Sequence, residues 1–180
     1  AQLLKRHHMI WLGGDHSIAI GTISGIASQA RKRKKKIGVV WVDAHADFNT
    51  PESSPSGNIH GMPLAVCCGF GPQSLRAVCG DFRKVDPRNV AIVGLRNIDR
   101  IEREQLVKSG VKLFSMEEID KFGVHKVMKR VIQQVASQVD QLHVSFDLDS
   151  VDPVYAPGVG TPVKGGLDYR EAHLIMEMLA

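Results

Sequence analysis

Short runs rich in valine and isoleucine alternate with longer helical segments along this chain of 180 residues. This alternation is typical of an α/β fold with a mainly parallel sheet, because each pair of parallel strands needs a crossover connection. The predicted strands are residues 9–12, 37–42, 90–95, 111–114 and 142–148. The predicted helices are residues 17–34, 99–109, 115–122, 124–139 and 169–180.

Composition places the chain among globular proteins, since 43% of its residues are hydrophobic and 23% are charged. Its longest apolar run, residues 37–42, is far shorter than the roughly 20 residues that cross a bilayer. The three cysteines, Cys67, Cys68 and Cys79, form no Cys-x-x-Cys pair. They indicate neither a disulfide framework nor a zinc site, and we therefore expect a reducing compartment such as the cytoplasm.

The net charge of +4 depends on one basic run, residues 31–36, whose six members are all lysine or arginine. Such a run fits a nucleic-acid-binding patch or the solvated end of a helix, where cations complement the helix dipole. We favour the helix end, because no aromatic side chains accompany the run for stacking on bases. We therefore expect neither a nucleic-acid partner nor a membrane.

Polar side chains follow four of the predicted strands. In an α/β sheet, ligands bind at the carboxyl ends of the strands, so residues that follow different strands can meet there. The segments concerned are residues 13–17 (Gly-Gly-Asp-His-Ser), 43–47 (Asp-Ala-His-Ala-Asp), 96–99 and 147–153.

Two of these regions repeat potential metal ligands at every second position. In an extended chain, Asp43, His45 and Asp47 share one face, and so do alternate residues from His143 to Asp149. An amphipathic strand with one wet face would show the same alternation. Aspartate is depleted in strands, however, and both runs end in paired aspartates, which favours metal binding.

A third region, around His16, adds one more potential metal ligand. His16 follows two glycines at the start of a predicted helix, where the dipole is expected to lower its pKa and favour the neutral, ligating form. The alternative is that Asp15 or His16 only caps this helix. The candidate ligands are His16, Asp43, His45, Asp47, Asp147 and Asp149.

Six ligands are too many for one structural zinc ion, which takes four. Four carboxylates balance the charge of two divalent cations, and oxygen ligands mixed with imidazoles suit Mn²⁺. Two ions about 3.5–4 Å apart can lower the pKa of a bridging water towards roughly 7. The residues alone therefore predict a two-metal hydrolase.

Three segments resemble the signature motifs of the ureohydrolase family, which includes arginases, agmatinases and formimidoylglutamases. They are residues 13–17, 43–47 and 145–153, in the family order. Within the family, residues 49–63 are similar to the arginase loop. The resemblance implies a three-layer α/β/α fold, a single catalytic domain over residues 1–180, and two Mn²⁺ ions per subunit.

The resemblance also implies how the metals are shared. His16, Asp43, Asp47 and Asp147 would bind one ion, and Asp43, His45, Asp147 and Asp149 would bind the other. A hydroxide bridging the ions would attack the guanidinium carbon, and Asp47 would accept its hydrogen bond. His60 matches the family's proton-shuttle histidine, which would protonate the leaving amine.

The remaining matches concern the substrate. Asn49, Ser54 and Ser56 match the family positions that bind the α-carboxylate of the substrate. Asn58 lies in the same loop. The α-amino group of the substrate would contact Asp99, with Glu102 as a weaker contact. Thr161 matches a residue near the guanidinium.

The implied reaction is hydrolysis of L-arginine to L-ornithine and urea by a homotrimer or homohexamer. Two alternatives remain open: an agmatinase or other guanidino-compound hydrolase, and a non-catalytic metal-binding relative. The family chains are longer, so the resemblance implies truncation at both ends, with the glutamate that anchors the guanidinium beyond Ala180.

Overall fold

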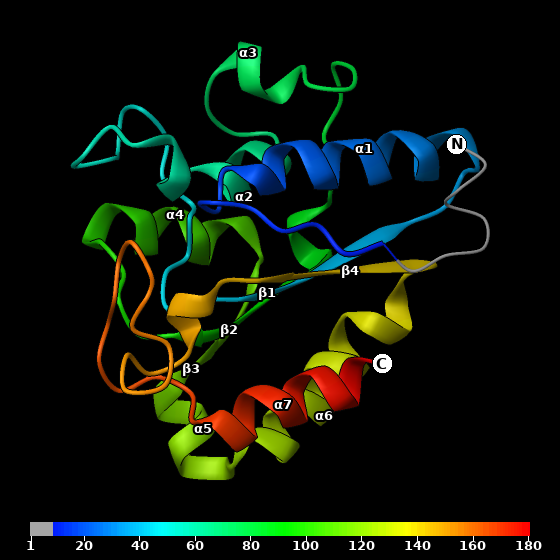
Figure 1. Ribbon diagram of the computed structural model, residues 1–180. Helices are drawn as coiled ribbons and strands as arrows, with labels where there is room; N and C mark the ends of the chain where they lie inside the picture. Colours follow the sequence, from blue (N-terminus) through cyan, green and yellow to red (C-terminus); the bar gives the residue numbers. More distant parts are fainter. Residues whose placement is uncertain (1–8) are drawn as a thin grey trace.

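A four-stranded parallel sheet in the order β3–β2–β1–β4 forms the centre of the computed structural model, which describes residues 9–180 (Figure 1). The first eight residues of the expected domain lie outside the described residues. The strands are β1 (Ile37–Val42), β2 (Val90–Leu95), β3 (Lys112–Ser115) and β4 (Gln141–Phe146). Val42 pairs with Val93 on one side and Phe146 on the other, so β2, β1 and β4 end at the same edge of the sheet.

Alternate side chains of β1 pack into different helical layers. Val39 and Trp41 belong to one hydrophobic cluster, and Val40 and Val42 belong to the other. The first cluster is covered by α1 (Ile18–Lys32), α2 (Pro63–Cys67) and α4 (Arg100–Ser109). The second is covered by α5 (Met116–Phe122), α6 (Val124–Gln134) and α7 (Tyr169–Leu179), on the other side of the sheet (Figure 1). The predicted three-layer α/β/α fold is confirmed.

Shorter helices complete the connections. They are η2 (Ile59–Gly61), α3 (Gln73–Arg76), η3 (Pro87–Asn89), η4 (Ala136–Gln138) and η5 (Leu148–Ser150). Within residues 9–180, no helix combines the length and apolar character that crossing a bilayer requires.

Capping explains why several helices begin one residue later than predicted. Ser115 accepts a hydrogen bond from the backbone of Glu118 and so precedes α5 as its N-cap. α4 begins at Arg100 rather than at Asp99, because Asp99 is its N-cap and the Glu102 side chain accepts a 3.4 Å hydrogen bond from the Asp99 backbone N–H.

The predicted strand at residues 9–12 is wrong. This segment forms no ladder with any strand of the described chain, and Ile10 and Leu12 are exposed. The ring centroid of Trp11 lies 6.0 Å from that of His143 on β4, so the segment runs past this edge of the sheet without pairing. An apolar run becomes a strand only where another backbone can bond to it.

Two other predicted boundaries fail for local reasons. The strand predicted over residues 142–148 ends at Phe146, because Asp147 accepts a hydrogen bond from the backbone of Asp149 and turns the chain into η5. The helix predicted over residues 124–139 ends at Gln134, because Val135 leaves the helical conformation.

Truncation of a fully buried side chain should destabilise this fold. Leu106 in α4 is fully buried, whereas the next residue, Val107, is 66% exposed. We expect Leu106→Ala to lower the free energy of unfolding by about 2–5 kcal/mol through the cavity it leaves. Val107→Ala should change it by less than about 0.5 kcal/mol. Urea denaturation followed by circular dichroism measures both, and equal losses would contradict this packing.

Candidate metal centre

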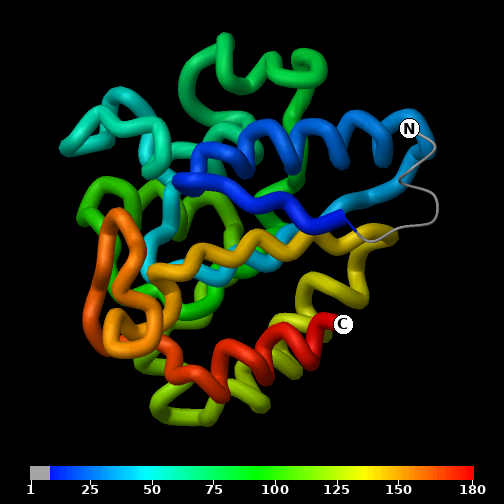
Figure 2. Tube along the Cα trace, viewed as in Figure 1, coloured from blue at the N-terminus to red at the C-terminus, as the bar shows by residue number. Residues whose placement is uncertain are grey.

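The loops that follow β1, β2 and β4 surround a cavity of about 1310 Å³ together with the start of α1. Figure 2 shows the two long loops, residues 49–58 and 152–166, at the same end of the molecule. The cavity runs along β4 from Gln141 to Phe146, and its end at the carboxyl edge of the sheet is where the sequence predicts the metal ligands. All six predicted ligands line it.

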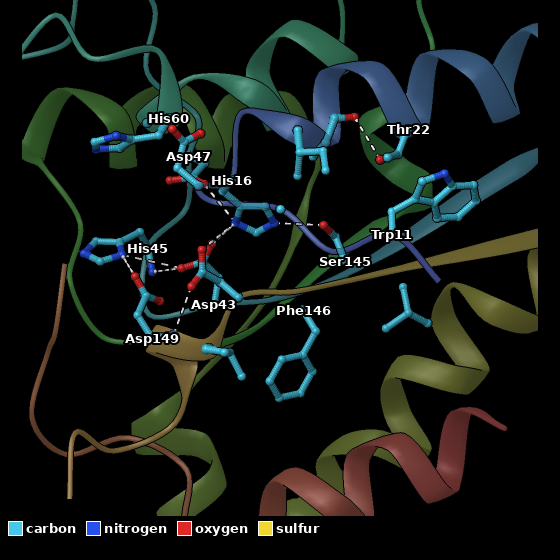
Figure 3. Close-up of a pocket in the computed structure, with 18 of the residues that line it drawn as sticks. Trp11, His16, Thr22, Asp43, His45, Asp47, His60, Ser145, Phe146 and Asp149 are labelled. Carbon is cyan, nitrogen blue, oxygen red and sulfur yellow. Dashed lines mark hydrogen bonds and ion pairs between the residues drawn. The ribbon is translucent and has the colours of Figure 1, made fainter. Parts of the chain in front are cut away.

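His16 lies among three carboxylates. Its Nδ1 atom is 2.8 Å from Oδ2 of Asp43, and 3.2 Å from an oxygen of both Asp47 and Asp147 (Figure 3). The imidazole is only 8% exposed. Ligand atoms of His16, Asp43 and Asp47 all lie within 4.8 Å of one another, which is close enough for one cation to bind all three.

A second group of ligands adjoins the first. The Nδ1 atom of His45 lies 3.0 Å from Asp149 and 3.5 Å from Asp43, and these three residues also offer ligand atoms within 4.8 Å of one another. Asp43 therefore belongs to both groups, with Oδ2 towards His16 and Oδ1 towards His45. The arrangement can hold two neighbouring cations that share this carboxylate.

The backbone that brings these ligands together is not the extended strand predicted for residues 43–47. The ladder ends at Val42, and the Asp43 side chain accepts a hydrogen bond of 2.7 Å from the backbone of His45, which starts a turn. Asp47 has a φ of 49°, in the left-handed region that non-glycine residues rarely adopt. The three side chains still converge, through this turn rather than through strand alternation.

The carboxylates control the protonation of both histidines. Burial alone would lower the pKa of His16, but hydrogen bonds to Asp147, Asp43 and Asp47 outweigh it and raise the pKa to about 11. Burial would likewise lower the pKa of His45, but its hydrogen bonds to Asp149 and Asp43 outweigh burial and raise the pKa to about 10. The predicted lowering of the His16 pKa by the helix dipole is therefore wrong for the metal-free chain, because the nearby negative charges have the larger effect.

The carboxylates themselves differ in protonation. Burial and the charge of Asp43 raise the pKa of Asp47 well above its ordinary value. Burial also acts to raise the pKa of Asp43, but its hydrogen bonds to His16 and His45 lower it overall. Protons bound to the cluster thus reduce the repulsion among its carboxylates. Divalent cations would displace these protons and take over that effect.

Side chains outside the predicted set hold the ligands in place. Trp41 stacks on His16 with ring centroids 3.8 Å apart, and its indole N–H donates a 2.8 Å hydrogen bond to Asp43. The Ser145 hydroxyl lies 2.8 Å from the other ring nitrogen of His16. Trp41 lies in the apolar run predicted as a strand over residues 37–42, and its position two residues before Asp43 is the signal that could have revealed this contact.

The half-buried guanidinium of Arg96 fixes the loop on the other side of the site. It donates hydrogen bonds of 2.6, 3.0 and 2.7 Å to the carbonyl oxygens of Asp149, Ser150 and Val163. Thr161, in the same loop, donates a 2.9 Å hydrogen bond to Asp149. This loop therefore positions a metal-site carboxylate as well as lining the cavity.

Most residues predicted to contact substrate line the same cavity. They are Asn49, Ser54, Ser56, His60, Asp99, Glu102 and Thr161. His60 lies on η2, and Figure 3 shows it above the metal ligands on the side of Asp47. Asn58 does not line the cavity. The roles of all eight residues towards a substrate remain predictions.

Several of these side chains also bond to the protein itself. Asn49 donates a hydrogen bond of 3.4 Å to Asp99. Glu102 accepts a 2.7 Å hydrogen bond from the backbone of Phe48, and burial raises the pKa of its carboxyl group. Glu102 thereby ties the start of α4 to the loop that follows the first ligands.

Comparison with known proteins agrees with this geometry. A family model described as "Arginase family" matches residues 1–180. Arginases from Bacillus caldovelox and Bacillus subtilis (strain 168) are 51% and 54% identical to the chain over 94% and 93% of its length. The chain spans about half the length of these curated relatives, 55% of each. The crystal structure of the Bacillus caldovelox arginase has a TM-score of 0.92 and 48% identity, over 99% of this chain and 58% of that one.

Binding of divalent cations should release protons. At pH 8 the metal-free chain carries a proton on His16 and His45, because their pKa values lie near 11 and 10. A metal ligand must be the neutral imidazole, so the two histidines alone should release about two protons per chain, and any proton held by Asp47 adds to this number. Titration calorimetry with Mn²⁺ in buffers of different ionisation enthalpy measures this number. His45→Ala should release about one proton fewer, and binding without proton release would contradict these pKa values.

Loss of the indole hydrogen bond should weaken metal binding. Trp41→Phe removes the donor to Asp43 but retains an aromatic ring beside His16. We expect the Mn²⁺ affinity to fall about tenfold or more, as for other residues that orient a ligand. Trp11→Phe, outside the ligand set, is the matched control. Unchanged affinity in Trp41→Phe would mean that the indole only fills space.

Proposed function

The chain belongs to the arginase family, and from this premise we propose that the protein hydrolyses the guanidinium group of L-arginine to L-ornithine and urea. The observation that carries the proposal is the pair of ligand groups that share Asp43 at the carboxyl edge of the sheet. A site for two neighbouring cations suits attack on a guanidinium, whose delocalised charge makes its carbon a poor electrophile.

We propose Mn²⁺ as the metal, because carboxylate oxygens mixed with imidazole nitrogens suit this ion. His16, Asp43 and Asp47 would hold one cation, and His45, Asp43 and Asp149 the other. In this proposal Asp147, which lies 3.2 Å from His16, serves both. When bound, the two cations supply an activated water at neutral pH.

The protein's own residues then have three tasks. Asp47 would accept a hydrogen bond from the attacking water and orient it. His60 would give a proton to the leaving amine, since it lies on the same side of the cavity. Thr161 would face the guanidinium while it holds Asp149.

Recognition of the α-carbon groups would distinguish arginine from other guanidino compounds. Asn49, Ser54 and Ser56 would bind the α-carboxylate, and Asp99 the α-ammonium group, with Glu102 supporting that position. A site built to hydrogen-bond a group can reject an analogue that lacks it by a large factor. Agmatine has no carboxylate and should therefore be a poor substrate. A homotrimeric or homohexameric assembly and a cytoplasmic location remain predictions.

Competition between substrates tests the proposed reaction. We expect the manganese-loaded protein to form urea from L-arginine, and an excess of agmatine to inhibit weakly. Urea formation from agmatine but not from L-arginine would overturn the assignment and favour an agmatinase.

The metal assignment predicts the effect of neutralising one ligand. Elemental analysis after manganese loading and desalting should find about two Mn per chain. Asp147→Asn should lower this number, because an amide replaces a carboxylate in the ligand set. Asp120→Asn, an exposed carboxylate outside the cavity, is the control. Unchanged occupancy in Asp147→Asn would exclude this residue as a ligand.

The proton-transfer role of His60 predicts a separation of binding from turnover. We expect His60→Ala to retain both metals and to lose about 10²–10⁴-fold in kcat, the range of general acid catalysis. His125→Ala, at an exposed position on α6, should leave both unchanged. Metal loss in His60→Ala would show that this residue acts in the metal site instead.

A further inference from the structure

A second cleft, of about 840 Å³, lies at the opposite end of the sheet. Ile37, the first residue of β1, lines it, whereas the metal ligands follow Val42, the last. A six-residue strand spans roughly 20 Å, so the cleft and the metal centre are separate sites. Nothing in the proposed arginine hydrolysis uses this cleft.

Basic side chains from four segments surround the cleft. Four come from the end of α1 and the residues after it, and the others come from the loop before η3, from η3 and from β3. They are Arg31, Lys34, Lys35, Lys36, Arg83, Lys84, Arg88 and Lys112. The helix dipole accounts for cations at the end of α1. It does not account for Arg83, Lys84 and Lys112, which lie on other elements.

Very little negative charge balances this cluster. Asp86 is the one acidic residue that lines the cleft within the described chain, and it already forms an ion pair of 2.7 Å with Arg88. Residues 9–180 provide no ion pair for the other seven basic side chains. Such a concentration of positive charge attracts anions to the cleft.

Two of the cations are held in place. Lys84 is only 4% exposed, and its ammonium group donates to the carbonyl oxygen of Gly80. Lys112 donates to the carbonyl oxygen of Arg88. Burial lowers the pKa of both lysines, because the loss of hydration outweighs the charge of Asp81 near Lys84 and of Asp86 near Lys112. An anion in the cleft would replace that lost hydration.

The shape of the cleft favours a compact anion over a nucleic acid. Its one aromatic side chain, Phe82, has Arg31 and Lys84 over its ring, 4.5 and 4.0 Å from the centroid. The ring therefore already stacks with cations of the protein, whereas binding of single-stranded nucleic acid depends on free aromatic faces. Linked phosphates concentrate several negative charges in a small volume and need no stacking partner.

We propose that this cleft binds a compact anion with two or more linked phosphate groups. An inorganic polyphosphate and a nucleoside polyphosphate share this chemistry. Binding is independent of the metal centre, so the proposal does not rest on the proposed hydrolysis.

Titration calorimetry at low ionic strength, without added metal, tests the proposal. The probes are inorganic tripolyphosphate, ATP, inorganic phosphate and a single-stranded DNA oligonucleotide. We expect saturable binding of one tripolyphosphate or ATP per chain, much weaker binding of inorganic phosphate, and loss of affinity with added salt. The tighter of the first two ligands identifies the source of the phosphates. Absence of saturable binding by both, or preferential binding of DNA, would overturn the proposal.

Two double variants distinguish specific binding in the cleft from non-specific attraction by the net charge of the chain. Lys35→Gln with Arg83→Gln removes two exposed cations of the cleft, and we expect at least about tenfold weaker binding. Lys32→Gln with Lys126→Gln removes the same charge from exposed positions outside the cleft and should change affinity less than about twofold. Equal weakening in both variants would show diffuse attraction and refute a site here.

Discussion

The crowding of four carboxylates around two imidazoles at one sheet edge is the interaction on which the rest of the site depends. Without positive charge between them, these aspartates would repel one another in a buried setting. In the metal-free chain, protonated His16 and His45 supply that charge, with Asp43 between them. Trp41, Ser145 and Arg96 then fix the positions of the charged groups. Cations bound here would take the place of these protons, because a metal ligand must be deprotonated.

Much of the fold follows from local sequence patterns. The boundaries of β1 and β2 are predicted correctly, because both strands are apolar throughout and buried on both faces. The run at residues 9–12 is also apolar throughout but stays unpaired, since a strand depends on a neighbouring backbone that local sequence does not reveal. The same limit applies to the ends of β4 and α6, where single residues, Asp147 and Val135, turn the chain.

The candidate site also has features that the sequence predicts and others that only the fold reveals. The repeated aspartates and histidines predict the candidate ligands, because few other roles explain so many of them after the strands. The contacts that support them join residues far apart in the chain, such as Thr161 with Asp149, or depend on a ring that is also a core residue, such as Trp41. The basic run at residues 31–36 supplies half of the basic side chains that line the second cleft. The other four, Arg83, Lys84, Arg88 and Lys112, are distant in the sequence and lie beside the run only because of the fold.

The two ends of β1 carry opposite charge: carboxylates gather beyond Val42 and basic side chains gather around Ile37. The chain is therefore strongly dipolar along this strand. A molecule with a net charge of +4 would be expected to repel cations as they approach. Because its positive charge is concentrated at the far end, a diffusing cation instead meets an attractive local field at the mouth of the metal centre. Segregation of charge along one strand would thus allow this basic chain to bind the cations proposed for its metal centre.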